Sequence, residues 1–228
     1  MNLRKAVVLL SGGMDSAVCA SIACNEGYTL YVLHVNYRQR TSTKELESAQ
    51  KLAAFYNAED FKVITLDFLR EIGGSGLIDE SIELPTEEVE SESEGIPPSY
   101  VPFRNSIILS LATAWAEVLG AEAIYYGANF IDFSGYPDCR PVYFEAFQNL
   151  INTGTKDGTV ITLKTPLSAM SKAEIVQKGL ELKTPFELTW SCYKEIERAC
   201  GVCDSCRLRL KGFTENGVTD PIPYVEQE

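Results

Sequence analysis

Apolar runs with strand character alternate with segments of helical periodicity along the chain, and this alternation restricts the fold more than any other feature. The expected strands cover residues 5–10, 28–35, 61–67, 123–127 and 159–163. The expected helices cover residues 15–25, 41–57, 104–119, 141–152 and 171–182. Because strands joined through helices run parallel, the sequence predicts an α/β fold with a Rossmann-like, five-stranded parallel sheet and helices on both faces.

The length of 228 residues allows one sizeable core with a small appendage. We expect a core domain over residues 1–188, with a long acidic loop at 70–98, and a Cys-rich segment at 189–228 that packs on it. Within that loop, residues 79–94 hold eight acidic residues and no basic one. Such a composition is typical of a solvated surface loop, and a lid that orders over bound substrate is the alternative.

The charge balance favours a small-molecule partner. The net charge is −12, whereas proteins that grip nucleic acid usually carry a basic surface, so we expect no nucleic acid partner. No apolar stretch approaches the length of a membrane span, so we expect no membrane partner. The apolar run after Lys5 is too short for a signal peptide, which predicts a cytoplasmic, reducing location for the seven cysteines.

The loop after the first expected strand carries few bulky side chains. It reads LSGGMDS and consists of Leu10, Ser11, Gly12, Gly13, Met14, Asp15 and Ser16. Glycines let the backbone approach a ligand, and N–H groups at a helix start bind anions, so this loop is a candidate phosphate site. Asp15 and Ser16 are expected to cap the helix, and a plain capped turn is the alternative. The dinucleotide and Walker glycine patterns are both absent from the sequence.

The SGGMDS loop resembles the pyrophosphate loop of the N-type ATP pyrophosphatases, which have an adenine nucleotide alpha hydrolase-like fold. The resemblance implies that ATP is cleaved between its α and β phosphates and that AMP passes to a carbonyl oxygen. It also implies that residues 10–16 hold the pyrophosphate together with Mg²⁺, and that Asp15, Ser16 and Lys172 are catalytic. Lys172 would neutralise phosphate charge, and a solvated lysine at a helix start is the alternative.

Four of the seven cysteines follow the spacing C-x7-C-x2-C-x2-C; they are Cys192, Cys200, Cys203 and Cys206. Four thiolates suit a closed tetrahedral Zn²⁺ site, which is structural because no position stays open for water. We expect nearby cations to balance its negative charge, namely Lys194, Arg198, Arg207, Arg209 and Lys211. An iron–sulfur cluster, a redox pair and a set of buried free cysteines are the alternatives.

Two further polar segments are expected at the same sheet edge as the loop. They read SYVPFRN, at 99–105, and GANFIDFSGYPDCR, at 127–140. Arg104 and Asn105 offer hydrogen bonds to a planar ligand. The second segment adds a group of polar side chains between glycine and proline bends, namely Asp132, Ser134, Asp138 and Arg140. An ordinary polar loop is the alternative, although loops at this edge often carry function.

Taken together, SGGMDS, VPFRN, DFSGYPDC and the cysteine spacing resemble the 7-cyano-7-deazaguanine synthase branch of the ATP pyrophosphatases over about residues 6–213. The resemblance implies a ligase that converts 7-carboxy-7-deazaguanine and ammonia to the nitrile through an adenylated acid and an adenylated amide. It implies ATP, Mg²⁺ and Zn²⁺ as cofactors and a homodimer as the assembly. It assigns the deazaguanine to Arg104, Asn105, Asp132, Ser134 and Asp138, with an acidic group facing the guanine-like edge.

The sequence departs from that branch at two positions. Arg38 replaces a usual glycine, so the turn there is expected to resist a positive φ, and Phe103 replaces a usual small residue. Two other functions remain open at this point. One is a related enzyme that adenylates another acid or a transfer-RNA base, and the other is a non-catalytic nucleotide-binding module.

Overall fold

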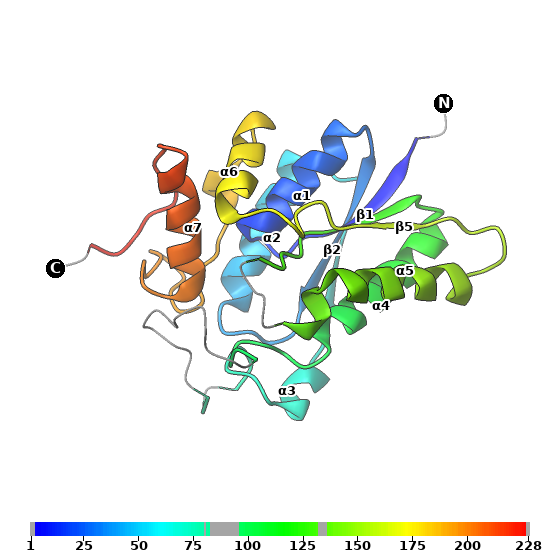
Figure 1. Ribbon diagram of the computed structural model, residues 1–228, viewed down its shortest axis with the longest axis horizontal. Helices are drawn as coiled ribbons and strands as arrows, with labels where there is room; N and C mark the ends of the chain where they lie inside the picture. The colour runs from blue at the N-terminus through cyan, green and yellow to red at the C-terminus, as the bar shows by residue number, and fades with distance from the viewer. Residues whose placement is uncertain (1–2, 80, 83–95, 132–135, 227–228) are drawn as a thin grey trace.

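Five parallel strands form the centre of the computed structural model, which describes residues 3–79, 81–82, 96–131 and 136–226 (Figure 1). Their order across the sheet is β3-β2-β1-β4-β5, so the first strand in the chain is the central one. The strands are β1 (Lys5–Leu9), β2 (Thr29–Asn36), β3 (Asp60–Thr65), β4 (Ala123–Tyr126) and β5 (Thr162–Lys164). The order reverses direction between β1 and β4, and such a switch point opens a crevice at the carboxyl ends of the strands.

Helices cover both faces of this sheet. The helices are α1 (Met14–Asn25), α2 (Ser42–Phe55), α3 (Phe68–Ile72), α4 (Arg104–Leu119), α5 (Pro141–Gly154), α6 (Lys172–Glu181) and α7 (Asp204–Glu215). Two short 3-10 turns span Pro137–Cys139 and Phe186–Leu188. One apolar core joins the sheet to α1, α2 and α6, and a second joins it to α4 and α5 (Figure 1). The predicted α/β fold is therefore confirmed.

Strand β1 shows why the sheet is buried on both sides. Ala6 and Val8 pack into the core beside α1, whereas Val7 and Leu9 pack into the core beside α4. Successive residues of a strand point to opposite faces, so a strand covered on both sides needs an unbroken apolar run. The sequence KAVVL meets this requirement.

Several element boundaries differ from those expected. The fifth strand covers Thr162–Lys164 rather than 159–163, and α1 begins at Met14 rather than at residue 15. Helices α3 and α7 were not expected. Helix α7 begins at Asp204 and includes Cys206, so part of the cysteine spacing is helical.

The expected domain division stays a prediction. Phe213, from the Cys-rich segment, packs in the same core as α1 and α6, so this segment completes the main core in addition to lying on it. Residues 80 and 83–95 lie outside the described residues, and with them most of the acidic loop and its lid interpretation. In the part of the chain that the structure describes, no helix combines the length and apolar character needed to cross a membrane.

The backbone at Arg38 contradicts the expectation for that turn. Arg38 has φ 63°, the left-handed value that a glycine would adopt easily. The Arg38 N–H donates to Asn36 Oδ1 at 2.9 Å, and the guanidinium pairs with Asp67, so local polar contacts compensate the strain. Phe103 has φ 58° and is 65% exposed, so it too has a left-handed backbone and projects into solvent.

Two helical glycines give a matched test of this packing. A Cβ on Gly179 of α6 would lie 2.2 Å from Phe186 Cζ, whereas a Cβ on Gly154 of α5 would meet nothing within 4 Å. We expect Gly179→Ala to lower the free energy of unfolding by about 1–3 kcal/mol through overpacking. Gly154→Ala should raise it by up to about 1 kcal/mol, because alanine favours a helix. Urea unfolding of both variants checks this, and equal effects would contradict the packing described here.

Candidate functional site

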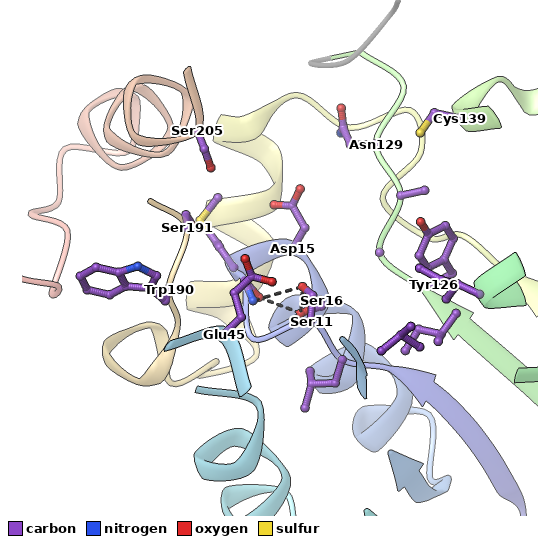
Figure 2. A pocket seen from close by; sticks show the side chains of 18 of the residues that line it. Ser11, Asp15, Ser16, Glu45, Tyr126, Asn129, Cys139, Trp190, Ser191 and Ser205 are labelled. Carbon is purple, nitrogen blue, oxygen red and sulfur yellow. Dashed lines mark hydrogen bonds between the residues drawn. The ribbon is translucent and has the colours of Figure 1, made fainter. Parts of the chain in front are cut away.

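A cavity opens at the carboxyl ends of β1, β2 and β4, where the switch point lies. Its lining includes Ser11, Asp15 and Ser16 after β1, Tyr37 after β2 and Tyr126 at the end of β4. Figure 2 shows the Ser11, Asp15, Ser16 and Glu45 side chains gathered at its centre, with Tyr126 on the opposite side. Sequence positions far apart thus contribute to a single cavity.

The loop after β1 holds the start of α1 open toward this cavity. Gly13 is the N-cap residue and no side chain caps the helix, so the expected capping by Asp15 and Ser16 is wrong. Ser16 Oγ instead donates to Gly13 O at 2.9 Å, and the Gly13 N–H donates to Ser11 Oγ at 3.2 Å. Uncapped N–H groups and the positive end of the helix dipole favour an anion at this position.

Two glycines set how closely other segments approach the loop. Gly12 has φ 94°, and a Cβ there would lie 2.3 Å from the backbone oxygen of Glu45 in α2. A Cβ on Gly127, after β4, would lie 3.1 Å from the backbone of Asp15. The Gly12 carbonyl accepts the Trp190 N–H at 2.9 Å. The loop is therefore held by backbone contacts from three distant parts of the chain.

Lys172 and Asp15 meet at the cavity wall. Lys172 Nζ lies 2.8 Å from Asp15 Oδ2 and 3.1 Å from Asp15 Oδ1, and the lysine is 7% exposed. Lys172 is the first residue of α6, after a capping box formed by Ser171 and Glu174. The structure thus brings together two of the expected catalytic residues, and the alternative of a solvated lysine at a helix start is wrong.

Glu45 is a cavity-lining acid that the sequence reasoning missed. One carboxylate oxygen accepts from Gln39 Nε2 at 2.7 Å, and the other accepts from Thr41 Oγ1 at 2.9 Å. Burial raises the pKa of Glu45, although both hydrogen bonds favour its charged form. Its place in the first turn of α2, against Gly12, follows from tertiary packing, and the sequence alone gives no signal for it.

The residues expected to hold a planar substrate separate into two groups. Arg104 lines the cavity, and its Nη1 donates to Tyr37 Oη at 2.9 Å. Asn105 is fully buried and bonds to the Asp138 region, with Nδ2 donating to Asp138 O at 3.0 Å and the backbone N–H to Asp138 Oδ2 at 3.2 Å. Asn105 and Asp138 therefore pack behind the described lining. Asp132 and Ser134 lie outside the described residues.

Aromatic side chains form much of the remaining wall. Those lining the cavity are Tyr37, Tyr126, Tyr136, Trp190 and Tyr193. None was singled out from the sequence, although Tyr37 and Tyr126 lie at strand ends, where lining residues are expected. Cys139 also lines the wall, and burial raises the pKa of its thiol to about 11, which keeps it neutral near pH 7. Such a wall suits a flat, partly apolar ring.

The four C-terminal cysteines converge beside the cavity. The Sγ atoms of Cys192, Cys200, Cys203 and Cys206 all lie within 4.8 Å of one another. The backbone N–H groups of Glu195 and Cys200 donate to Cys192 Sγ at 3.3 and 3.4 Å, as around metal-bound thiolates. A tetrahedral zinc site needs sulfur atoms about 3.8 Å apart, so this donor set fits a metal ion such as Zn²⁺.

Arg209 does not act as one of the free counterions expected around this cluster. It is 1% exposed, and its Nε donates to Asp220 Oδ2 at 2.7 Å. Its Nη1 donates to Thr189 Oγ1 at 2.6 Å. Asp220 already balances its charge, so Arg209 ties α7 to the segment that carries Trp190 and Cys192.

Gly12 offers a direct test of the loop geometry. We expect Gly12→Ala to lower the free energy of unfolding by about 1–3 kcal/mol and to weaken ATP binding, because a Cβ meets the α2 backbone. Gly27 is the control, since it also has a positive φ but nothing within 4 Å of its Cβ position. Gly27→Ala should lose stability while binding ATP normally. Calorimetric titration with ATP, alongside urea unfolding, separates the two effects.

Comparison with known proteins places these features in a family. The model of the family described as queuosine biosynthesis protein QueC matches residues 5–217. A protein of Sulfurovum sp. named 7-cyano-7-deazaguanine synthase is 54% identical over 221 residues, 97% of this chain and 98% of its own. A protein of the same name from Oceanobacillus iheyensis is 49% identical over 225 residues, 99% of this chain and 100% of its own.

Similar solved structures support the fold. A 4-thiouridine synthetase in complex with RNA and ATP has a TM-score of 0.53 at 18% identity, covering 97% of this chain and 47% of that one. An NMN synthetase from Francisella tularensis has a TM-score of 0.50 at 16% identity, covering 96% of this chain and 79% of that one. At these identities the likeness concerns the fold alone. The match over residues 5–217, together with two relatives near half identity over almost their full lengths, shows that the chain belongs to the QueC family of queuosine biosynthesis proteins.

Proposed function

We propose that this chain is an ATP-dependent carbon–nitrogen ligase that converts 7-carboxy-7-deazaguanine and ammonia to 7-cyano-7-deazaguanine, with ATP cleaved to AMP and pyrophosphate. Its relatives carry the name of that synthase. The observation that carries the proposal is the cavity, which joins an uncapped helix start to a wall rich in aromatic side chains. An anion-binding end and a ring-binding end within one cavity suit the joining of a nucleotide to a flat acid.

The proposed reaction has two rounds of activation. A carboxylate oxygen of the acid attacks the α phosphorus of ATP, and the bond to the β phosphate breaks to release pyrophosphate. Ammonia then attacks the carbonyl carbon, and AMP leaves with loss of a proton, which gives the amide. The amide oxygen then attacks the α phosphorus of a second ATP, which releases pyrophosphate, and loss of AMP and of both N–H protons leaves the nitrile. The protein must chiefly position the reactants and stabilise phosphate charge.

In this proposal residues 10–16 bind the phosphates of ATP. The N–H groups at the start of α1 receive the pyrophosphate, with Ser11 and Ser16 beside it. Lys172 offsets the negative charge that grows on the phosphates as the bond breaks. Asp15 holds the Lys172 ammonium in place. Its carboxylate would also supply an oxygen ligand to Mg²⁺, which would add further charge stabilisation when bound.

In this proposal the flat ring of the acid substrate binds at the aromatic end of the cavity. Tyr37, Tyr126 and Tyr136 line that section of the wall, next to Arg104. Asn105 and Asp138 support this wall through their mutual hydrogen bonds. We keep Asp132 and Ser134, which lie outside the described residues, as proposed substrate contacts.

We further propose a structural Zn²⁺ on the four cysteines, a homodimer, and a cytoplasmic location with free ammonia as the nitrogen source. Trp190, Ser191 and Tyr193 surround Cys192 in sequence and line the cavity, which supports a structural effect of the metal on the site. We also propose that the metal-binding segment covers residues 189–228.

The stoichiometry of the reaction tests the proposed function. With Mg-ATP, ammonium and 7-carboxy-7-deazaguanine, we expect two molecules of AMP and two of pyrophosphate for each nitrile, with products identified by mass spectrometry. Omission of the acid should abolish release of pyrophosphate. Release without the acid, or an acid-dependent reaction that yields no nitrogen-containing product, would refute the assignment.

Metal removal tests the role of the cysteine cluster. We expect about one zinc ion per chain by elemental mass spectrometry. Cys206→Ser should lose the zinc, lower the melting temperature and weaken ATP binding, because Trp190 holds Gly12 from the same segment. Cys24→Ser, at a half-buried cysteine outside the cluster, should retain the metal and bind ATP normally. Zinc-free protein with unchanged ATP affinity would show that the cysteine cluster has no effect on the ATP site.

A further inference from the structure

Within the described part of the chain, three cationic side chains line the cavity, and they differ in how the protein balances their charge. Lys172 lies 2.8 Å from Asp15, and Arg209 lies 2.7 Å from Asp220. Among the described residues, no carboxylate oxygen lies within 4.0 Å of an Arg104 nitrogen, the distance that defines an ion pair. A cation taken from water without a matching anion is costly, so Arg104 has the character of a site for an anionic ligand.

The neutral contacts of Arg104 involve all three guanidinium nitrogens, but among the described residues they leave one N–H on Nη1 and one on Nη2 for a ligand. Nη1 donates to Tyr37 Oη at 2.9 Å, and the guanidinium carbon lies 5.1 Å from the centre of the Tyr37 ring. Nε and Nη2 are each 3.4 Å from Asn105 Oδ1, which already accepts from Tyr126 Oη at 2.6 Å. These contacts fix the orientation of the guanidinium without neutralising it.

The nearby acids are held by other donors. Glu45 accepts from Gln39 and Thr41, and Asp138 Oδ2 accepts from the Asn105 backbone N–H. Each acts on Arg104 only through space. Among the residues described, the protein therefore places no carboxylate in direct contact with the guanidinium, although two lie close enough to affect it.

The position of Arg104 puts its ligand beside the aromatic wall of the cavity rather than within the phosphate loop. It is the first residue of α4, which packs on the face of the sheet opposite α1 and α6, and its neighbours in the wall are tyrosines. The phosphate loop and Lys172 belong to α1 and α6. An anion at Arg104 is therefore expected on the molecule that carries the flat ring.

We propose that Arg104 binds the carboxylate of the acid substrate through its planar N–H donors and thereby distinguishes the acid from the amide formed after it. This inference rests on the proposed function. A guanidinium pairs with both oxygens of a carboxylate in one plane. While one oxygen attacks the α phosphorus, the other stays on Arg104.

The amide cannot reproduce this contact. Its single oxygen must be adenylated, and an NH₂ group occupies the position of the second oxygen. An NH₂ group donates hydrogen bonds and does not accept them, so it meets the donors of Arg104 unfavourably. Arg104 is thus expected to assist the first activation and to contribute little to the second.

A comparison of the acid with the amide as substrates tests this inference. Purified full-length protein is given either the acid or the amide, with Mg-ATP and saturating ammonium in both cases, and KM and kcat are measured for each. Binding of each compound without ATP is measured by calorimetry. We expect Arg104→Gln to weaken binding of the acid and raise its KM by about 10- to 100-fold, because a charged hydrogen-bonded pair is lost. The same variant should change the values for the amide by less than about threefold.

Two further variants make the result specific. Arg104→Lys keeps the charge but loses the planar fork, so it should recover part of the affinity for the acid only. Lys172→Gln, on the phosphate side, should slow both conversions by a similar factor. Circular dichroism and melting temperatures confirm that each variant is folded.

The possible outcomes are distinct. Equal losses for acid and amide in Arg104→Gln would show that Arg104 serves the ring or the nucleotide, and would overturn the inference. No loss for either would do the same, since Arg104 would then be structural. Failure of the unaltered protein to convert both compounds would instead refute the proposed function itself.

Discussion

Close backbone contact around the loop after β1 is the constraint on which the rest of the site depends. Gly12 packs where a Cβ would lie 2.3 Å from the Glu45 backbone oxygen, and Gly127 presses on the Asp15 backbone. The Trp190 N–H holds the Gly12 carbonyl from a third direction. These contacts leave the start of α1 uncapped and facing the cavity. The proposed anion-binding end therefore depends on glycines, which bring no side chain between the helix start and the cavity.

The sequence predicted the parts of this arrangement that local chemistry determines. A buried run that ends in SGGMDS predicts a loop at the strand end, and the cysteine spacing predicts a cluster. Lys172 was also expected, although it meets Asp15 across 157 positions. Glu45 and the lining tyrosines were missed because only tertiary packing selects which residues of α2 and of the strand ends face the cavity. The capping roles predicted for Asp15 and Ser16 were wrong because Gly13, which has no side chain, is the N-cap residue of α1.

The two positions expected to depart from the family pattern share one physical property. Arg38 and Phe103 both have left-handed backbones, which cost L-residues roughly 1–2 kcal/mol. Asn36 holds the Arg38 N–H, and Tyr100 Oη accepts the Phe103 N–H at 3.0 Å. The turn shapes are therefore kept by their surroundings, so Tyr37, which precedes Arg38, and Arg104, which follows Phe103, still reach the cavity.

The long sequence separation between Asp15 and Lys172 bears on how the molecule acquires its activity during folding. Contacts between distant positions form slowly, because a large loop must close before they stabilise the chain. The early βαβ unit can assemble from local pieces, but the loop after β1 stays unsupported until α6 and the Trp190 segment dock. Competence to bind ATP is consequently among the last properties that the folding chain gains, and a partly synthesised chain carries the loop without the site.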